Sequence, residues 1–223
     1  MFAFALSFST LTDINSLKEP SSDAKKARAF VESCLASSLS DGISDVAQHG
    51  GYYVVPEPKT IVYLFHQIPF YFKNATLHVP TKKEVEEQLG AYVSDRLKYC
   101  IESYNGISSH DLAVSIAIYD DAIKATTSGS IEISNQKKTT RLSGFQAQKN
   151  SQFGMVYNAV LEILEIQKRY PTEICLTCAY TIATEKGLAI SVVLIGNKTA
   201  LFTILDNQIN PTVNYMFLYE VVK

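Results

Sequence analysis

The chain lacks the features that mark several common classes of protein. It contains no Trp and no block of basic residues, and its 20 Lys and Arg nearly balance its 22 Asp and Glu, for a net charge of −2. Nucleic acid binding depends on clustered positive charge, so the composition argues against it. No apolar run approaches the roughly 20 residues that span a bilayer, so no transmembrane segment is seen in this chain.

Motifs of catalysis are also missing. The sequence has no Gly-x-Ser-x-Gly nucleophile elbow, no phosphate-binding loop and no dinucleotide fingerprint. A zinc site normally draws its ligands from closely spaced pairs of Cys or His. The four histidines are instead scattered, at His49, His66, His78 and His110. We therefore predict a non-enzymatic protein without cofactor or metal.

The composition does provide for a sizeable core. Of 223 residues, 47% are hydrophobic and 19% are charged, which suits one large domain or two small ones. The four cysteines are compatible with two disulfides or with four buried thiols. Two Asn-x-Thr sequons, at Asn74 and Asn197, are candidate glycosylation sites.

The stretch from Asp23 to Tyr53 predicts a long helix followed by a bend at Gly50-Gly51. Ser22 and Asp23 supply a helix start signal, and Gly50 supplies the stop. Helical spacing joins its apolar residues into one face for burial. These residues are Ala24, Ala27, Phe30, Val31, Cys34, Leu35, Leu39, Ile43, Val46 and Ala47.

A second helix is predicted to begin at Thr81, because Thr81 and Glu84 fit the capping box. Its apolar stripe consists of Val85, Leu89, Tyr92, Val93, Leu97, Cys100 and Ile101. Cys100 thus lies on the buried face of this helix, as Cys34 does on the first. Two helices packed on one sheet would bring these faces together, and an exported chain would oxidise the pair. We therefore expect a Cys34–Cys100 disulfide.

The rest of the chain alternates between strands and helices. Strands are predicted over 112–118, 123–127, 131–133, 139–148, 188–195, 199–205 and 213–222, and helices over 151–170 and 173–186. This order predicts an α+β fold, with about four helices packed on an antiparallel sheet. Residues 23–223 are expected to form a single domain.

The segment from Tyr52 to Phe72 is rich in proline and aromatic residues. We expect a short strand over 61–65 and an ordered loop elsewhere, because proline interrupts the hydrogen-bond ladder of a sheet. Such a cluster of rings either packs in the core or forms a platform for carbohydrate or peptide. Core packing is the simpler interpretation.

Residues 1–22 are predicted to form an apolar strand and a polar linker. Large side chains at Phe2, Phe4, Leu6 and Phe8 alternate with small ones, so one face of the strand is strongly apolar. The strand either forms an edge of the chain's own sheet or is donated to another copy. The linker, 9–22, could span at most about 45–50 Å, a length that could reach a neighbouring subunit.

Cys175-x-x-Cys178 is the most chemically suggestive motif in the sequence. Redox catalysis needs a thiolate of low pKa, and the thioredoxin-like βαβ pattern that usually provides it is absent here. We favour a local structural disulfide or a buried thiol pair.

Four short segments together resemble a group of uncharacterised archaeal cell-surface proteins. They are Phe30–Leu35, Gly50–Tyr53, Lys98–Ile101 and Ile174–Cys178. The resemblance implies an exported protein that can be glycosylated. Members of that group typically carry an N-terminal membrane or pilin-like segment, whereas this chain has the alternating strand there.

Three functions follow from these observations. The most concrete is an extracellular, non-enzymatic cell-surface protein, a filament or pilus subunit whose N-terminal strand inserts into the sheet of another copy. Phe2, Phe4, Leu6 and Phe8 would then make the subunit contact. The alternative is a monomeric surface-displayed domain that binds through the aromatic 52–72 region. The third is a thiol-redox enzyme that uses Cys175 and Cys178.

Overall fold

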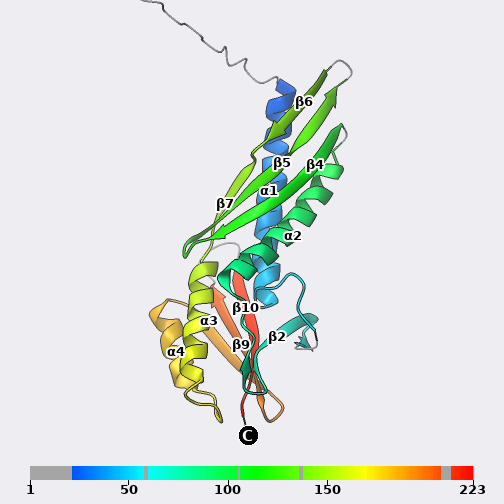
Figure 1. The fold of residues 1–223 in the computed structure, drawn as a ribbon. Helices are drawn as coiled ribbons and strands as arrows, with labels where there is room; N and C mark the ends of the chain where they lie inside the picture. The colour runs from blue at the N-terminus through cyan, green and yellow to red at the C-terminus, as the bar shows by residue number, and fades with distance from the viewer. Residues whose placement is uncertain (1–21, 58–59, 105, 136–137, 207–211, 223) are drawn as a thin grey trace, which may run out of the picture.

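The computed structural model describes residues 22–222, apart from 58–59, 105, 136–137 and 207–211. The fold is α+β and elongated, with one sheet and two long helices at one end and a second sheet with two shorter helices at the other (Figure 1). The predicted N-terminal strand and most of its linker lie outside the described residues.

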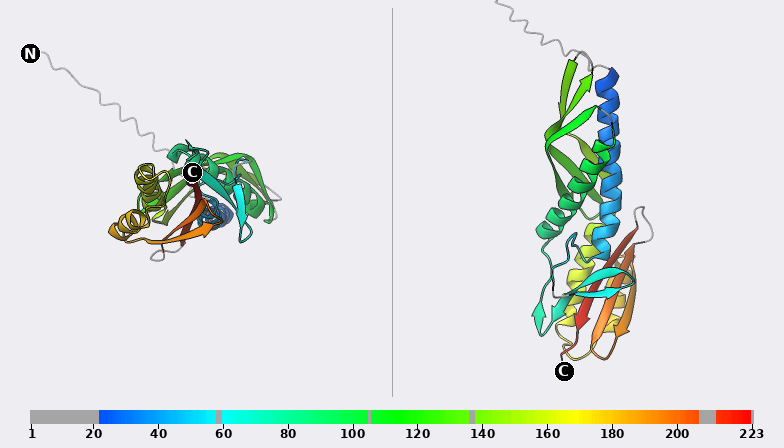
Figure 2. Two further views of the ribbon diagram at one scale, coloured as in Figure 1. Left: turned by 90° about the horizontal axis from the view of Figure 1, so that it is seen from below. Right: turned by 90° about the vertical axis from the view of Figure 1, so that its right-hand side faces the viewer.

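We call the sheet drawn at the top of the figures the upper sheet and the one drawn below it the lower sheet. Helix α1, Ser22–Gln48, runs beside the upper sheet and ends near the lower sheet (Figure 2). It ends just before Gly50, as its stop signal predicted. Helix α2, Lys82–Glu102, packs against α1. The predicted capping box is confirmed, because the Glu84 amide donates to Thr81 Oγ1 and the Thr81 amide donates to Glu84 Oε2, at 3.2 and 2.7 Å.

The upper sheet contains β4 (Ile107–Ile118), β5 (Ala122–Asn135), β6 (Lys138–Ser143) and β7 (Gln146–Asn150). The predicted interruption between 123–127 and 131–133 is wrong, because β5 continues through Gly129. The prediction of one strand over 139–148 is also wrong. That segment forms two strands, β6 and β7, which pair with successive parts of β5.

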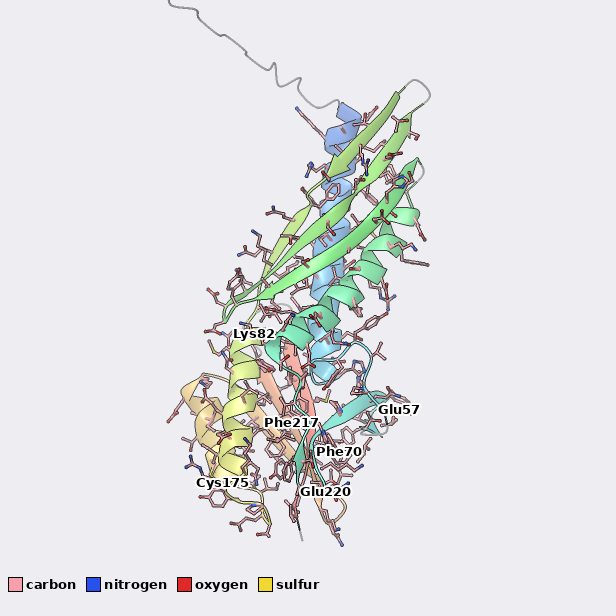
Figure 3. The ribbon with its side chains drawn as sticks, in the orientation of Figure 1. Glu57, Phe70, Lys82, Cys175, Phe217 and Glu220 are labelled. Atoms are coloured by element: carbon pink, nitrogen blue, oxygen red, sulfur yellow. A yellow bond between two sulfur atoms is a disulfide. The ribbon has the colours of Figure 1, made fainter. Side chains whose placement is uncertain are left out.

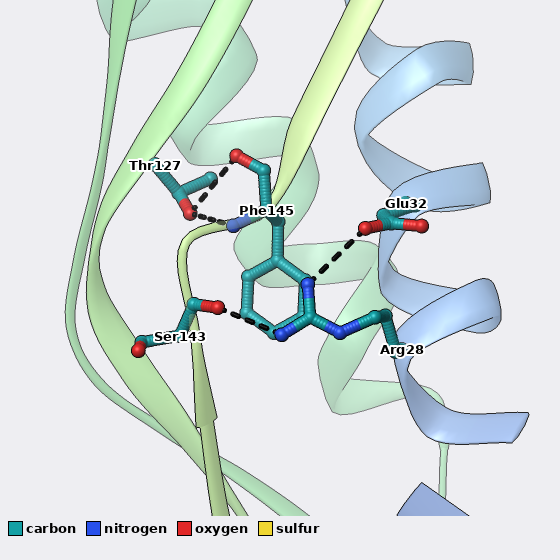
Figure 4. Close-up of polar contacts among 5 residues, drawn as sticks. All are labelled: Arg28, Glu32, Thr127, Ser143 and Phe145. Atoms are coloured by element: carbon teal, nitrogen blue, oxygen red, sulfur yellow. Dashed lines mark hydrogen bonds and ion pairs between the residues drawn. The ribbon is translucent and has the colours of Figure 1, made fainter. Parts of the chain in front are cut away.

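The break between β6 and β7 comes from the burial of Phe145 (Figure 4). The Phe145 amide donates to Thr127 Oγ1, and the Thr127 amide donates to the Phe145 carbonyl, both at 3.0 Å. The Arg28 guanidinium lies 5.0 Å from the centre of the Phe145 ring and donates to the Ser143 carbonyl. These contacts attach the β6–β7 turn to α1.

The lower sheet has the order β1-β2-β10-β9-β8, with β3 paired to β2. Its strands are β1 (Thr60–Tyr63), β2 (His66–Lys73), β3 (Thr76–Leu77), β8 (Ala189–Ile195), β9 (Thr199–Asp206) and β10 (Val213–Glu220). The prediction of a single antiparallel sheet is therefore wrong in two respects. The strands form two sheets, and β2 and β10 pair in parallel.

We expected a loop after residue 65, but His66–Lys73 forms strand β2. Pro69 is tolerated in this strand because it lies at the end of the pairing with β1, directly before the pairing of Phe70 with β10. The ladder consequently loses little from the missing amide hydrogen.

The lower sheet contributes to two hydrophobic clusters. Helices α3 (Phe153–Gln167) and α4 (Leu176–Glu185) contribute to the main hydrophobic cluster, which also includes residues of α1, α2 and both sheets. A second cluster lies elsewhere on the lower sheet, where Ile61 and Tyr63 of β1 pack against buried residues of three other strands. Those residues are Ile68, Phe70, Leu201 and Leu218.

Candidate functional site

Strand β8 forms an open edge of the lower sheet. Among the described residues it pairs with β9 alone, so the backbone groups on its other side lack a partner strand. Its sequence, Ala-Ile-Ser-Val-Val-Leu-Ile, contains neither a charge nor a proline. Natural sheets usually protect an edge strand with charged residues or proline, and an edge strand without them is a template for strand addition.

The β4 edge of the upper sheet differs from β8, because helix α2 covers it. Helix α2 lies along β4, where Ser94 Oγ accepts a hydrogen bond from the Val114 amide and Glu86 Oε1 accepts one from the Ile118 amide, both at 2.9 Å. The approach is close, since a Cβ added to Gly90 would lie 2.8 Å from the Val114 carbonyl oxygen. Side chains of α2 therefore satisfy amides of β4.

A pocket of about 650 Å³ lies beside β8. It is lined by Thr172, Glu173, Ile174, Leu176, Val192, Leu194, Gly196, Asn197, Lys198 and Val221. The α3–α4 connection forms one wall, β8 forms another, and the β8–β9 turn and the end of β10 complete it. Leu194 is 70% exposed and Leu176 is 47% exposed, so the pocket presents apolar side chains to solvent.

The wall from the α3–α4 connection is organised by the buried side chain of Gln167. Gln167 Nε2 donates to the carbonyls of Tyr170 and Glu173, and Gln167 Oε1 accepts from the Cys175 amide at 3.0 Å. A disulfide between Cys175 and Cys178 closes the first turn of α4. Cys175 and Glu220 lie toward the same end of the molecule (Figure 3).

The second disulfide joins Cys34 of α1 to Cys100 of α2, with a Cα–Cα distance of 5.9 Å. This is the pairing expected from the two helical faces. All four cysteines are paired. Two disulfides fit an extracellular protein.

Three of the seven Tyr and Phe rings in the predicted aromatic region are buried, all of them in β2. Phe70, Tyr71 and Phe72 are buried, whereas Phe65 is 99% exposed. The Tyr71 hydroxyl donates to the Gly50 carbonyl at 2.6 Å and lies 2.7 Å from the Tyr215 hydroxyl. This part of the segment packs in the core and joins the bend after α1 to β10.

The buried phenols predict a loss of stability at alkaline pH. Burial raises the pKa of both Tyr71 and Tyr215 above the ordinary value of 10.0. Because the folded-state pKa is the higher one, their contribution is complete below pH 10 and declines as the pH rises further. Each phenol should reduce the free energy of unfolding by about 1.4 kcal/mol per pH unit above 10. Urea unfolding across this range measures the slope.

Tyr71→Phe provides the control for this prediction. It removes one phenol, so the slope above pH 10 should become shallower, although the protein should lose about 1–3 kcal/mol at neutral pH because the Gly50 carbonyl loses its donor. Equal slopes above pH 10 for the native protein and Tyr71→Phe would contradict the assignment of the alkaline loss of stability to the buried phenols.

Both sequons lie in exposed hairpin turns. Asn74 lies in the two-residue turn between β2 and β3, and Asn197 lies in the β8–β9 turn. Asn197 also lines the pocket. Glycosylation of Asn74 and Asn197 stays a prediction.

The sequence reasoning did not identify the pocket residues Leu176 and Leu194 or the positioning residue Gln167. The signal in the sequence that could have identified Gln167 is its polar side chain at the end of an apolar helix.

Among the described residues no group of His, Cys, Asp and Glu could hold a metal ion, and no helix there is long and apolar enough to cross a membrane. No family model, curated protein or solved structure matches the chain.

Proposed function

We propose that this protein is an extracellular, non-enzymatic surface protein that assembles with other copies of itself by accepting a strand at the β8 edge. The observation that carries the proposal is the uncharged β8 edge, with an apolar pocket directly beside it. Strand addition uses both features, since backbone hydrogen bonds supply affinity and alternate side chains enter pockets.

The segment Phe2–Phe8 has the pattern that this edge requires. In a strand its large side chains would all fall on one face, and each would gain about 1.5–3 kcal/mol on burial. Leu176 and Leu194 offer an apolar surface for such side chains. The small side chains of Ala3, Ala5 and Ser7 would then fall on the other face.

The linker 9–22 can span at most roughly 45–50 Å, a length that could reach the β8 edge of a neighbouring copy.

This arrangement has a consequence for the assembly. The donor segment and the pocket are different surfaces, so the contact between copies is heterologous. Heterologous contacts produce rings when they close and filaments when they do not. A filament or pilus subunit is the form of assembly that we propose.

Removal of residues 1–9 tests the proposal. The shortened chain should stay folded and become monomeric, and Phe4→Asp/Leu6→Asp should act likewise because a buried carboxylate without a partner is costly. Sedimentation velocity and negative-stain microscopy measure assembly, and circular dichroism measures folding. A synthetic peptide of residues 1–9 should bind the shortened protein.

Leu194→Lys tests the acceptor side, with Leu64→Lys as its matched control. The two leucines are equally exposed, at 70% and 71%, but Leu64 lies in the β1–β2 turn, away from the pocket. We expect assembly to be lost in the first variant only. A full-length protein that stays monomeric at high concentration, or a shortened chain that unfolds, would refute the proposal.

A further inference from the structure

Asn197 combines two features that concern the β8 edge. It begins the sequon Asn197-Lys198-Thr199, and it is one of the residues that line the pocket beside β8. Asn197 is exposed in the β8–β9 turn, so a glycosyltransferase can reach its side chain. Its two neighbours in the chain, Gly196 and Lys198, line the same pocket. A glycan on Asn197 would therefore begin at the rim of the pocket.

The turn that contains Asn197 is held in place on two sides. Ile195 and Thr199 form the last pair of β8 and β9. The Lys198 carbonyl accepts a hydrogen bond from the Val221 amide at 2.8 Å, which attaches the turn to the chain just after β10. Val221 also lines the pocket. Because the backbone on both sides of Asn197 is fixed, the first sugar of a glycan would stay beside the pocket.

The second sequon lies at a different place in the lower sheet. Asn74 lies in the β2–β3 turn, and β10 and β9 separate β2 from β8 in the order of strands. Asn74 is not among the residues that line the pocket beside β8. A glycan on Asn74 would therefore leave the β8 edge open, so the two sequons form a matched pair for comparison.

We propose that glycosylation of Asn197 blocks strand acceptance at β8 and makes the modified copy a terminator of assembly. The inference rests on the strand acceptance proposed above. A glycan at the rim and an incoming strand compete for the same space over Leu176 and Leu194. The modified copy keeps its residues 1–9 and can still donate them. Because each copy donates and accepts at different surfaces, a copy that cannot accept ends the assembly.

The modification acts through bulk. Asn197 Nδ2 forms a bond to the anomeric carbon of an activated sugar phosphate, and the bond from that carbon to the phosphate oxygen breaks. The phosphate leaves, and the amide nitrogen loses one proton. The linkage itself adds no charge, so it excludes the strand by occupying space. A strand that is already bound at β8 covers the rim, so the modification has to precede assembly.

The test compares full-length chains that carry a glycan on one sequon only. Thr76→Ala removes the first sequon and keeps Asn74 in its left-handed turn, so that Asn197 alone is modified in a host that N-glycosylates exported proteins. Asn197→Gln leaves Asn74 as the modified residue and is the matched control. Mass spectrometry of peptides measures the occupancy of each sequon, and lectin affinity isolates the modified copies.

Each modified protein is mixed, at about one copy in ten, with unmodified protein from a host without N-glycosylation, and negative-stain microscopy measures filament length. Every copy that cannot accept a strand lies at the end of a filament, so copies modified at Asn197 should reduce the mean length to about ten copies. Copies modified at Asn74 should leave the length unchanged.

Equal filament lengths in the two mixtures would overturn the proposal, as would an Asn197 that the glycosylating host leaves unmodified. Absence of filaments from the unmodified protein would have a different meaning. It would refute strand acceptance at β8 itself, and with it the role of the Asn197 glycan.

Discussion

Replacing both Cys34 and Cys100 by Ala is expected to lower the free energy of unfolding by about 4 kcal/mol. The disulfide links positions 66 residues apart, so it removes a large amount of conformational entropy from the unfolded chain. It also joins α1 to α2 within the main hydrophobic cluster. The double variant leaves no free thiol at the site, and urea unfolding followed by circular dichroism measures the loss.

The second disulfide provides the matched control. Cys175 and Cys178 are three residues apart, so their replacement by Ala should cost only about 2 kcal/mol by the same relation. Equal losses for the two pairs would show that loop closure does not account for the effect. A loss below about 1 kcal/mol at Cys34 and Cys100 would contradict the prediction.

Gly129→Ala is expected to destabilise the protein by about 3 kcal/mol. Gly129 has a φ of +76°, and it lies opposite an irregularity in β4 between His110 and Ala113. A Cβ at this position would fall 2.2 Å from the Asp111 carbonyl oxygen and 2.7 Å from that of His110. Backbone atoms of a paired strand cannot move aside locally, so the cost of overpacking adds to the cost of the left-handed conformation.

Gly144→Ala separates these two costs. Gly144 has a φ of +68°, but a Cβ there would meet no atom within 4 Å. The free energy of unfolding of Gly144→Ala should therefore fall only by the cost of the left-handed conformation, about 1–2 kcal/mol. Thermal and urea unfolding of both variants measure the difference, and equal losses would show that the approach of Asp111 to Gly129 is not restrictive.

The two long helices could be predicted because their signals are local. Apolar spacing, the capping box of Thr81 and the glycines after α1 all depend on residues a few positions apart. The same spacing placed Cys34 and Cys100 on buried faces, which made their pairing foreseeable before any contact was known.

The strands at Gly129, Pro69 and 139–148 were predicted less well, because each depends on a partner distant in the sequence. Gly129 stays within β5 because β4 is irregular opposite it. Pro69 is accommodated because β2 changes partner there. The segment 139–148 divides because Phe145 enters the core beside Arg28. Alternation along one strand contains no information on these neighbours.

The sequence by itself determined the α+β class and the four helices, since these follow from local periodicity. Only the tertiary structure decided that β8 is an edge and that Leu176, Leu194 and Val221 meet at one pocket. Those three residues come from separate segments, which the order of strands in the lower sheet brings together. Strand order depends on burial across the whole chain, so no single segment of the sequence specifies it.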